Sequence, residues 1–123
     1  EPGGPYTGAG LGGPSPEDLK RIRDDIASDA TPLRKILNSA SFKNNFKTLE
    51  GEQLKTAPKG FEADNPGIDL LRYKQFLLIR RFTDKEVLSD SFLTEADNTF
   101  KAMRPFFNYM SEVLTTDPNG LDM

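Results

Sequence analysis

The sequence predicts an α+β domain in which four to five helices pack on a small, incomplete β-sheet. The chain has 123 residues, 36% hydrophobic and 28% charged, as expected for one globular domain with its own core. Several Ser-Pro, Thr-Pro and Asn-Pro pairs precede amphipathic segments, which is typical of helix starts. The longest aliphatic run, Phe-Leu-Leu-Ile at residues 76–79, lies between cations and predicts a strand near residues 75–81 that is buried on both faces. A buried helical segment is the competing interpretation, because four residues cannot separate the two periodicities.

Residues 1–14 are rich in glycine and proline and admit two interpretations. They hold six of the ten glycines of the chain. They predict either a strand near residues 5–11, where small residues let another backbone come close, or a flexible lead-in. The single domain then spans residues 15–115, and residues 116–123 are expected to fray. Because the chain opens without methionine, we expect a fragment of a longer protein.

Two proline-containing pairs predict the first two helices. Ser15 is the expected N-cap of the first, with Pro16 at the first helical position and an end near residues 28–29. The apolar face of this helix is marked by Leu19, Ile22 and Ile26. Thr31 and Pro32 repeat the arrangement for the second helix. Its apolar stripe consists of Leu33, Ile36, Leu37 and Ala40.

A short aromatic turn follows the second helix. Ser41 is expected to cap it, and Phe42 and Phe46 share one side because they lie four positions apart. The next segment, residues 47–65, contains several glycines and prolines and predicts no regular structure.

Two further helix starts lie on either side of the predicted strand. Asn65 is the expected N-cap of a third helix, with Pro66 at its first position. Thr83 and Glu86 have the spacing of a capping box and predict a short helical turn.

The last helix is predicted to be the longest. It should begin at Asp90 or Ser91 and run to Thr115 with a broad apolar face. Pro105 lies inside it and predicts a kink or a break near residues 102–104, because proline removes a backbone hydrogen bond.

The composition excludes several classes of chemistry. The chain contains no cysteine and no histidine, which excludes disulfides, thiolate or imidazole catalysis and the usual zinc sites. We therefore predict no catalytic residue, no metal ligand and no cofactor. The absence of cysteine fits a reducing, cytoplasmic location. No stretch approaches the roughly 20 apolar residues of a membrane span, so we expect no membrane partner.

The net charge of −3 is unevenly distributed. Residues 55–82 hold six cations and three anions, whereas the rest of the chain is acidic. An acidic chain argues against a general nucleic-acid binder, whose basic surface normally dominates its domain. The basic segment leaves room for a local anion-binding site.

These segments, taken in order, resemble a known family. The likeness is carried by residues 6–11 (Tyr-Thr-Gly-Ala-Gly-Leu), 14–19, 58–61 (Pro-Lys-Gly-Phe), 64–66 (Asp-Asn-Pro) and 70–76 (Leu-Leu-Arg-Tyr-Lys-Gln-Phe). The chain resembles the C-terminal half of the mostly bacterial family called domain of unknown function 2461. The resemblance implies that an N-terminal half is missing, and it implies no activity. That family often has histidine where this chain has Asn65, which argues against acid–base chemistry at this position.

The basic segment supplies the first candidate site. An anion could be bound by Lys55, Lys59, Gly60, Arg72, Lys74 and Arg80. Glycine permits close backbone approach, lysine supplies a point charge and arginine a two-pronged donor. The simpler interpretation, which we favour, is that these cations are solvated or pair with nearby acidic residues.

Two other groups of residues are candidate sites. Glu62, Asp64 and Asp69 could act as a carboxylate or metal site, but their spacing does not force them together, and a polar loop explains them. A sticky surface could be formed by Phe100, Met103, Phe106, Phe107, Tyr109 and Met110. For most of these six, ordinary core is the favoured interpretation.

We expect a non-catalytic binding or interaction module, or a half-domain, that uses the basic surface at residues 55–82. Its partner would be a small anionic ligand, another protein or the missing N-terminal half. The alternative is the C-terminal part of an enzyme whose catalytic residues lie in that absent half.

Overall fold

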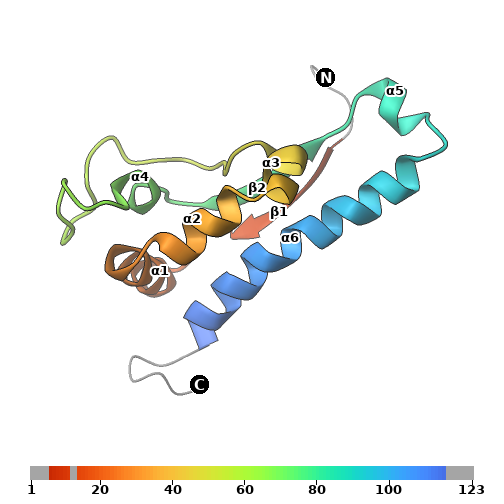
Figure 1. The fold of residues 1–123 in the computed structure, drawn as a ribbon. Helices are drawn as coiled ribbons and strands as arrows, with labels where there is room; N and C mark the ends of the chain where they lie inside the picture. The colour runs from red at the N-terminus through yellow and green to blue at the C-terminus, as the bar shows by residue number, and fades with distance from the viewer. Residues whose placement is uncertain (1–5, 12–13, 116–123) are drawn as a thin grey trace.

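The computed structural model describes residues 6–11 and 14–115, which form a two-stranded ribbon and six helices (Figure 1). In chain order these elements are β1 (Tyr6–Leu11), α1 (Pro16–Ser28), α2 (Thr31–Leu37), α3 (Ala40–Phe46), α4 (Ile68–Leu71), β2 (Phe76–Arg81), α5 (Asp84–Val87) and α6 (Phe92–Thr115). The α+β class with a small, incomplete sheet is therefore confirmed. The tail that was predicted to fray, residues 116–123, lies outside the described residues.

The ribbon joins two segments that are far apart in the sequence. β1 and β2 are antiparallel, with Tyr6 opposite Arg81 and Leu11 opposite Phe76. Both predicted strands are confirmed, and the helical interpretation of residues 76–79 is excluded.

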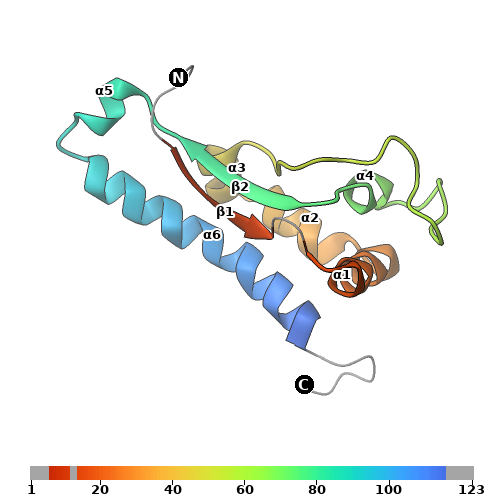
Figure 2. The ribbon, with the colours of Figure 1, turned by 180° about the vertical axis from the view of Figure 1, so that it is seen from behind.

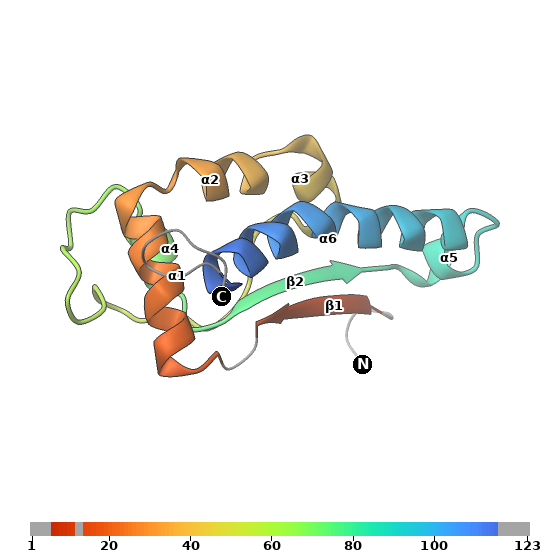
Figure 3. The same cartoon turned by 90° about the horizontal axis from the view of Figure 1, so that it is seen from below.

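The prediction that residues 76–79 form a strand buried on both faces is wrong. Phe76 and Leu78 are buried, whereas Leu77 and Ile79 are only half-buried. Figures 2 and 3 show α2, α3 and α6 together on one side of the ribbon. In an antiparallel strand that is covered on one face, every second side chain is less buried. The first four residues of β2 alternate in this way between buried and half-buried.

One face of α6 forms the centre of the core. This helix packs on α1, α2 and α3. Its buried side chains include Met103, Phe106, Tyr109 and Met110, four of the six that the sequence left open between core and sticky surface. Phe107 is half-buried, and Phe100 is 56% exposed. The Tyr109 hydroxyl donates a hydrogen bond to Asp25 of α1. The Tyr109 pKa is raised mainly because the side chain is buried, and this hydrogen bond raises it further.

Capping was predicted correctly at two helices. The Ser15 hydroxyl accepts the backbone N–H of Asp18 at 3.1 Å, as expected for the N-cap of α1. Thr83 and Glu86 form a capping box before α5: the Thr83 hydroxyl accepts the Glu86 N–H at 3.1 Å, and the Glu86 carboxylate accepts the Thr83 N–H at 2.8 Å.

Two other capping predictions were wrong, by one residue at α2 and by two residues at α3. Thr31 is the first residue of α2, and its N–H donates to the Asp29 carboxylate at 3.0 Å. The N-cap of α3 is Ser39, whose hydroxyl accepts the Phe42 N–H at 3.2 Å, and Ser41 lies within that helix. The N-cap position of α2 is Ala30, which has no side-chain oxygen, whereas the cap of α3 is the hydroxyl of the earlier Ser39.

Asn65 stabilises a turn and does not cap α4. Its side-chain oxygen accepts the Gly67 N–H at 2.7 Å, and the helix begins one residue later, at Ile68. A Cβ at Gly67 would lie 3.2 Å from both Ala30 and Ile26, so α1 and this turn pack closely because the residue is glycine.

The helix α6 continues through Pro105 without the predicted break. Buried residues lie on both sides of the proline, with Met103 before it and Phe106 and Met110 after it. Packing of these side chains offsets the backbone hydrogen bond that proline cannot form.

Among the side chains of α6, we expect removal of Phe106 to lower the free energy of unfolding most. Phe106→Ala should lower the free energy of unfolding by about 3–5 kcal/mol, because the side chain is completely buried and leaves a cavity. Urea denaturation measures this change. Asn108→Ala, at an exposed position of the same helix, should change it by less than about 0.5 kcal/mol. Equal effects of the two substitutions would contradict the described packing of α6.

Candidate anion-binding pocket

A pocket with a volume of about 350 Å³ lies between α2, α3, α4 and the segment that follows α3. Its charged residues are Arg34, Lys43, Lys47 and Asp69. Its apolar and aromatic residues are Leu37, Phe42, Leu49, Leu70 and Tyr73, and its neutral polar residues are Asn38, Thr48 and Gln53. The apolar members are mostly buried and the two lysines are exposed, so the pocket has an apolar floor and a cationic rim.

The two lysines lie on the flank of the aromatic face of α3. Phe42 and Phe46 point into the core, with their rings 5.2 Å apart. Lys43 follows Phe42 within α3, and Lys47 follows Phe46 directly after the helix ends. Among the residues that the structure describes, neither lysine forms an ion pair.

Lys47 has a strained backbone. Its φ of 66° is the one positive value at a non-glycine residue in the described part of the chain. With a ψ of −60°, it is the centre of a γ-turn in which the Thr48 N–H donates to the Phe46 carbonyl at 2.7 Å. Such conformations cost on the order of 1–3 kcal/mol and are concentrated at functional sites.

The third cation of the pocket is held by a carboxylate. Arg34 donates to both oxygens of Asp69, at 2.6 and 3.1 Å, and to the Pro66 carbonyl at 2.7 Å. Hydrogen bonds to Asp69 raise the pKa of Arg34, and the same bonds lower the pKa of Asp69. Because the Arg34 charge is neutralised within this pair, the charge available to a ligand comes mainly from Lys43 and Lys47.

Tyr73 forms part of the floor. Its hydroxyl donates to the Leu49 carbonyl at 2.9 Å, and its ring stacks on Phe76 with centroids 6.0 Å apart. Burial, with smaller contributions from Asp69 and Glu50, raises the Tyr73 pKa. The phenol is therefore a neutral structural donor and not a base at neutral pH.

None of the six residues predicted from the basic segment lines this pocket. Lys55 and Lys59 are exposed in the segment before α4. Gly60 has a φ of 90° at the third position of a turn closed by a hydrogen bond from the Phe61 N–H to the Pro58 carbonyl, at 3.1 Å. Glycine is the usual residue at that position. Anion binding at this turn stays a prediction.

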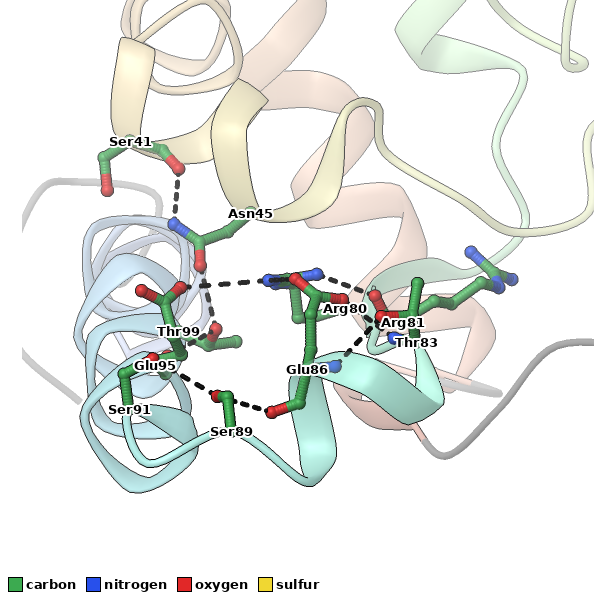
Figure 4. Close-up of polar contacts among 10 residues, drawn as sticks. All are labelled: Ser41, Asn45, Arg80, Arg81, Thr83, Glu86, Ser89, Ser91, Glu95 and Thr99. Atoms are coloured by element: carbon green, nitrogen blue, oxygen red, sulfur yellow. Dashed lines mark hydrogen bonds and ion pairs between the residues drawn. The ribbon is translucent and has the colours of Figure 1, made fainter.

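The other three predicted cations have partners within the protein. Arg72 donates to the Leu54 carbonyl at 2.9 Å, and the Lys74 ammonium lies 3.9 Å from Glu52. Arg80 lies between Glu86 and Glu95, at 3.1 and 3.9 Å, as Figure 4 shows. Its guanidinium also stacks 4.2 Å above the centre of the Phe82 ring. Arg72 and Lys74 thus connect the residues that follow α4 to the segment that precedes it. Arg80 connects β2 to α5 and α6.

The carboxylates considered from the sequence are also apart. Asp69 pairs with Arg34, whereas Glu62 and Asp64 are exposed. Within residues 6–11 and 14–115, no three acidic side chains gather in a way that could hold a metal ion.

Sequence reasoning missed Arg34, Lys43 and Lys47. One signal was present, since two lysines four apart beside two phenylalanines four apart predict a cationic edge next to a buried face. The convergence of α2 and α4 on that edge had no local signal.

Residues 1–109 match the sequence profile of a conserved hypothetical protein family, DUF2461. The chain belongs to this family. The part matched to DUF2461 includes every residue of the pocket and ends within α6. No curated protein and no solved structure matches the chain. In the described part of this DUF2461 chain, no helix has both the length and the apolar character needed to cross a bilayer.

The Arg34–Asp69 pair predicts a pH-dependent contribution to stability. Because folding lowers the pKa of Asp69, this contribution is complete above the ordinary aspartate pKa of about 3.9 and is lost as the pH falls through the lowered value. Urea denaturation should find the chain more stable than Asp69→Asn at neutral pH, with a difference that shrinks in acid.

Asp64→Asn is the matched control for this pH series. Asp64 is exposed and forms no ion pair among the described residues, so its replacement should give no such acid-dependent difference. A stability difference for Asp69→Asn that stays constant down to the lowest pH would show that the ion pair does not stabilise the fold.

Proposed function

We propose that the chain is a non-catalytic, cytoplasmic binding module whose pocket takes a small anion that carries an apolar group. The observation that supports this most directly is the pair of lysines, Lys43 and Lys47, beside a buried apolar floor and without carboxylate partners in the described residues. Lysine is a compact positive charge suited to a carboxylate or phosphate.

The size and lining of the pocket support the same ligand class. A volume of about 350 Å³ lies within the range of roughly 300–1,000 Å³ that is common for small-molecule sites. Phe42, Leu70 and Tyr73 offer apolar surface for a ring or a short hydrocarbon chain. The strained backbone of Lys47 is at the cationic rim, the part of the pocket that would bind the charged group of the ligand.

Binding should depend on the pocket lysines. Isothermal titration calorimetry with benzoate, octanoate and adenosine monophosphate should identify at least one anion that binds. The double variant Lys43→Gln/Lys47→Gln should weaken that binding about 100-fold, since each charge-assisted hydrogen bond contributes about 1.5–3 kcal/mol. Thermal unfolding should show that the variant remains folded, because both side chains are exposed.

The matched control is Lys55→Gln/Lys59→Gln, which removes the same charge from the segment before α4. This variant should bind as the unmodified chain does. If it lost the ligand while the pocket variant kept it, the anion site would lie on the segment before α4, and the pocket assignment would be wrong. The absence of binding by all three anions would count against the proposal as a whole.

A further inference from the structure

The first half of α6 carries two of the three exposed large apolar side chains of the described residues, and the third, Leu88, lies just after α5. Leu93 is 81% exposed and Phe100 is 56% exposed. They lie seven positions apart, and Phe107, which is half-buried, continues the series. Residues at this spacing lie on one face of a helix. Figures 1 and 3 show that this end of α6 and α5 extend beyond the strands and α3.

Two charged residues lie along the same stripe. At about 100° per residue, Asp97 and Arg104 fall within about 80° of the helix surface that holds Leu93, Phe100 and Phe107. Both are exposed. Asp97 lies before Phe100 and Arg104 lies after it. The stripe is therefore negatively charged on one side of Phe100 and positively charged on the other.

We propose that this stripe is an interface with a second copy of the chain, in which α6 packs antiparallel on α6 about a two-fold axis at Phe100. Reversal of the helix direction places Leu93 opposite Phe107 of the partner subunit. It also brings Asp97 within one residue, about 1.5 Å along the helix, of the level of Arg104 of the partner subunit. The two-fold axis forms each of these contacts twice. In a parallel pair, each charge would instead face its own counterpart, so the order of charges selects the antiparallel arrangement.

The interface is independent of the anion-binding pocket, which involves α2, α3 and α4 and no residue of α6. From Leu93 to Phe107 the stripe is about 21 Å long, at 1.5 Å per residue. A contact confined to one helix pair is small, so we expect a reversible dimer with a dissociation constant of roughly 10–100 μM.

Sedimentation velocity over about 1–500 μM, a range that brackets this constant, tests the dimer. The 123-residue chain should shift from monomer to dimer as its concentration rises. Phe100→Asp should weaken the dimer at least about 100-fold, because an apolar side chain at the axis is lost from both subunits. A chain that remains monomeric throughout would overturn the proposal and leave the stripe to a different partner.

Asn98→Asp is the matched control, since it adds the same charge at an exposed position about 160° around the helix from Phe100. It should dimerise as the unmodified chain does. Equal weakening by Asn98→Asp and Phe100→Asp would show that added charge alone, and not this stripe, controls association.

A charge exchange tests the antiparallel register and does not depend on the folding of Phe100→Asp. Asp97→Arg alone and Arg104→Asp alone should each weaken the dimer about tenfold, because each places like charges opposite one another. The double variant should recover most of the lost affinity. Asp97 also pairs with Lys101 at 3.0 Å within the helix, but an exposed pair of this kind contributes little to folding. Failure of the double variant to recover would overturn the proposed register.

Discussion

The burial of one face of α6 against α1, α2 and α3 is the interaction on which the rest of the structure depends. Phe106 and Met110 provide its apolar centre. Two polar contacts fix the helix along its length: Tyr109 donates to Asp25 of α1, and the buried Thr99 donates to the Asn45 side chain of α3 at 2.8 Å. These contacts orient α1 and α3. They therefore also determine the position of the pocket walls, because α3 lines the pocket and α1 holds α4. No buried side-chain nitrogen or oxygen in the described residues lacks a partner, so the core has no polar defect.

The pocket is the space left between two parts that are anchored separately. The short α4 is held to α1 by Arg23, which donates to the Leu71 and Tyr73 carbonyls at 2.8 and 3.0 Å, and to α2 by the Arg34–Asp69 pair. On the other side, α3 is held by α6, and its last turn ends in the strained backbone of Lys47. The surrounding core can enforce that conformation because Phe46 and Leu49 are buried on either side of it. The anchored walls and the strained cationic rim are the features on which the proposed ligand binding rests.

The sequence predicted features that depend on contacts within a few residues, such as helix caps. It did not predict features that depend on contacts between distant segments, such as the pocket. The Ser15 cap and the Thr83–Glu86 box were predicted because their hydrogen bonds span three residues. The cations of residues 55–82 were conspicuous because they are close together in the sequence, yet Arg80 is occupied by Glu86 and Glu95. The pocket cations were overlooked because α2, α3 and α4 converge only through tertiary packing. Composition carries no information about such convergence.

The long-range pairing of β1 with β2 has a consequence for the order of folding. Tyr6 pairs with Arg81, so the ribbon closes a loop that contains α1 to α4, and the entropy of closing so long a loop must be overcome first. Helical contacts between neighbouring segments form faster than such pairings. During synthesis, β1 leaves the ribosome before β2, so its ribbon partner is absent until β2 has followed. Of the two strands, the one that is made first is thus secured only after α1 to α4 have been made.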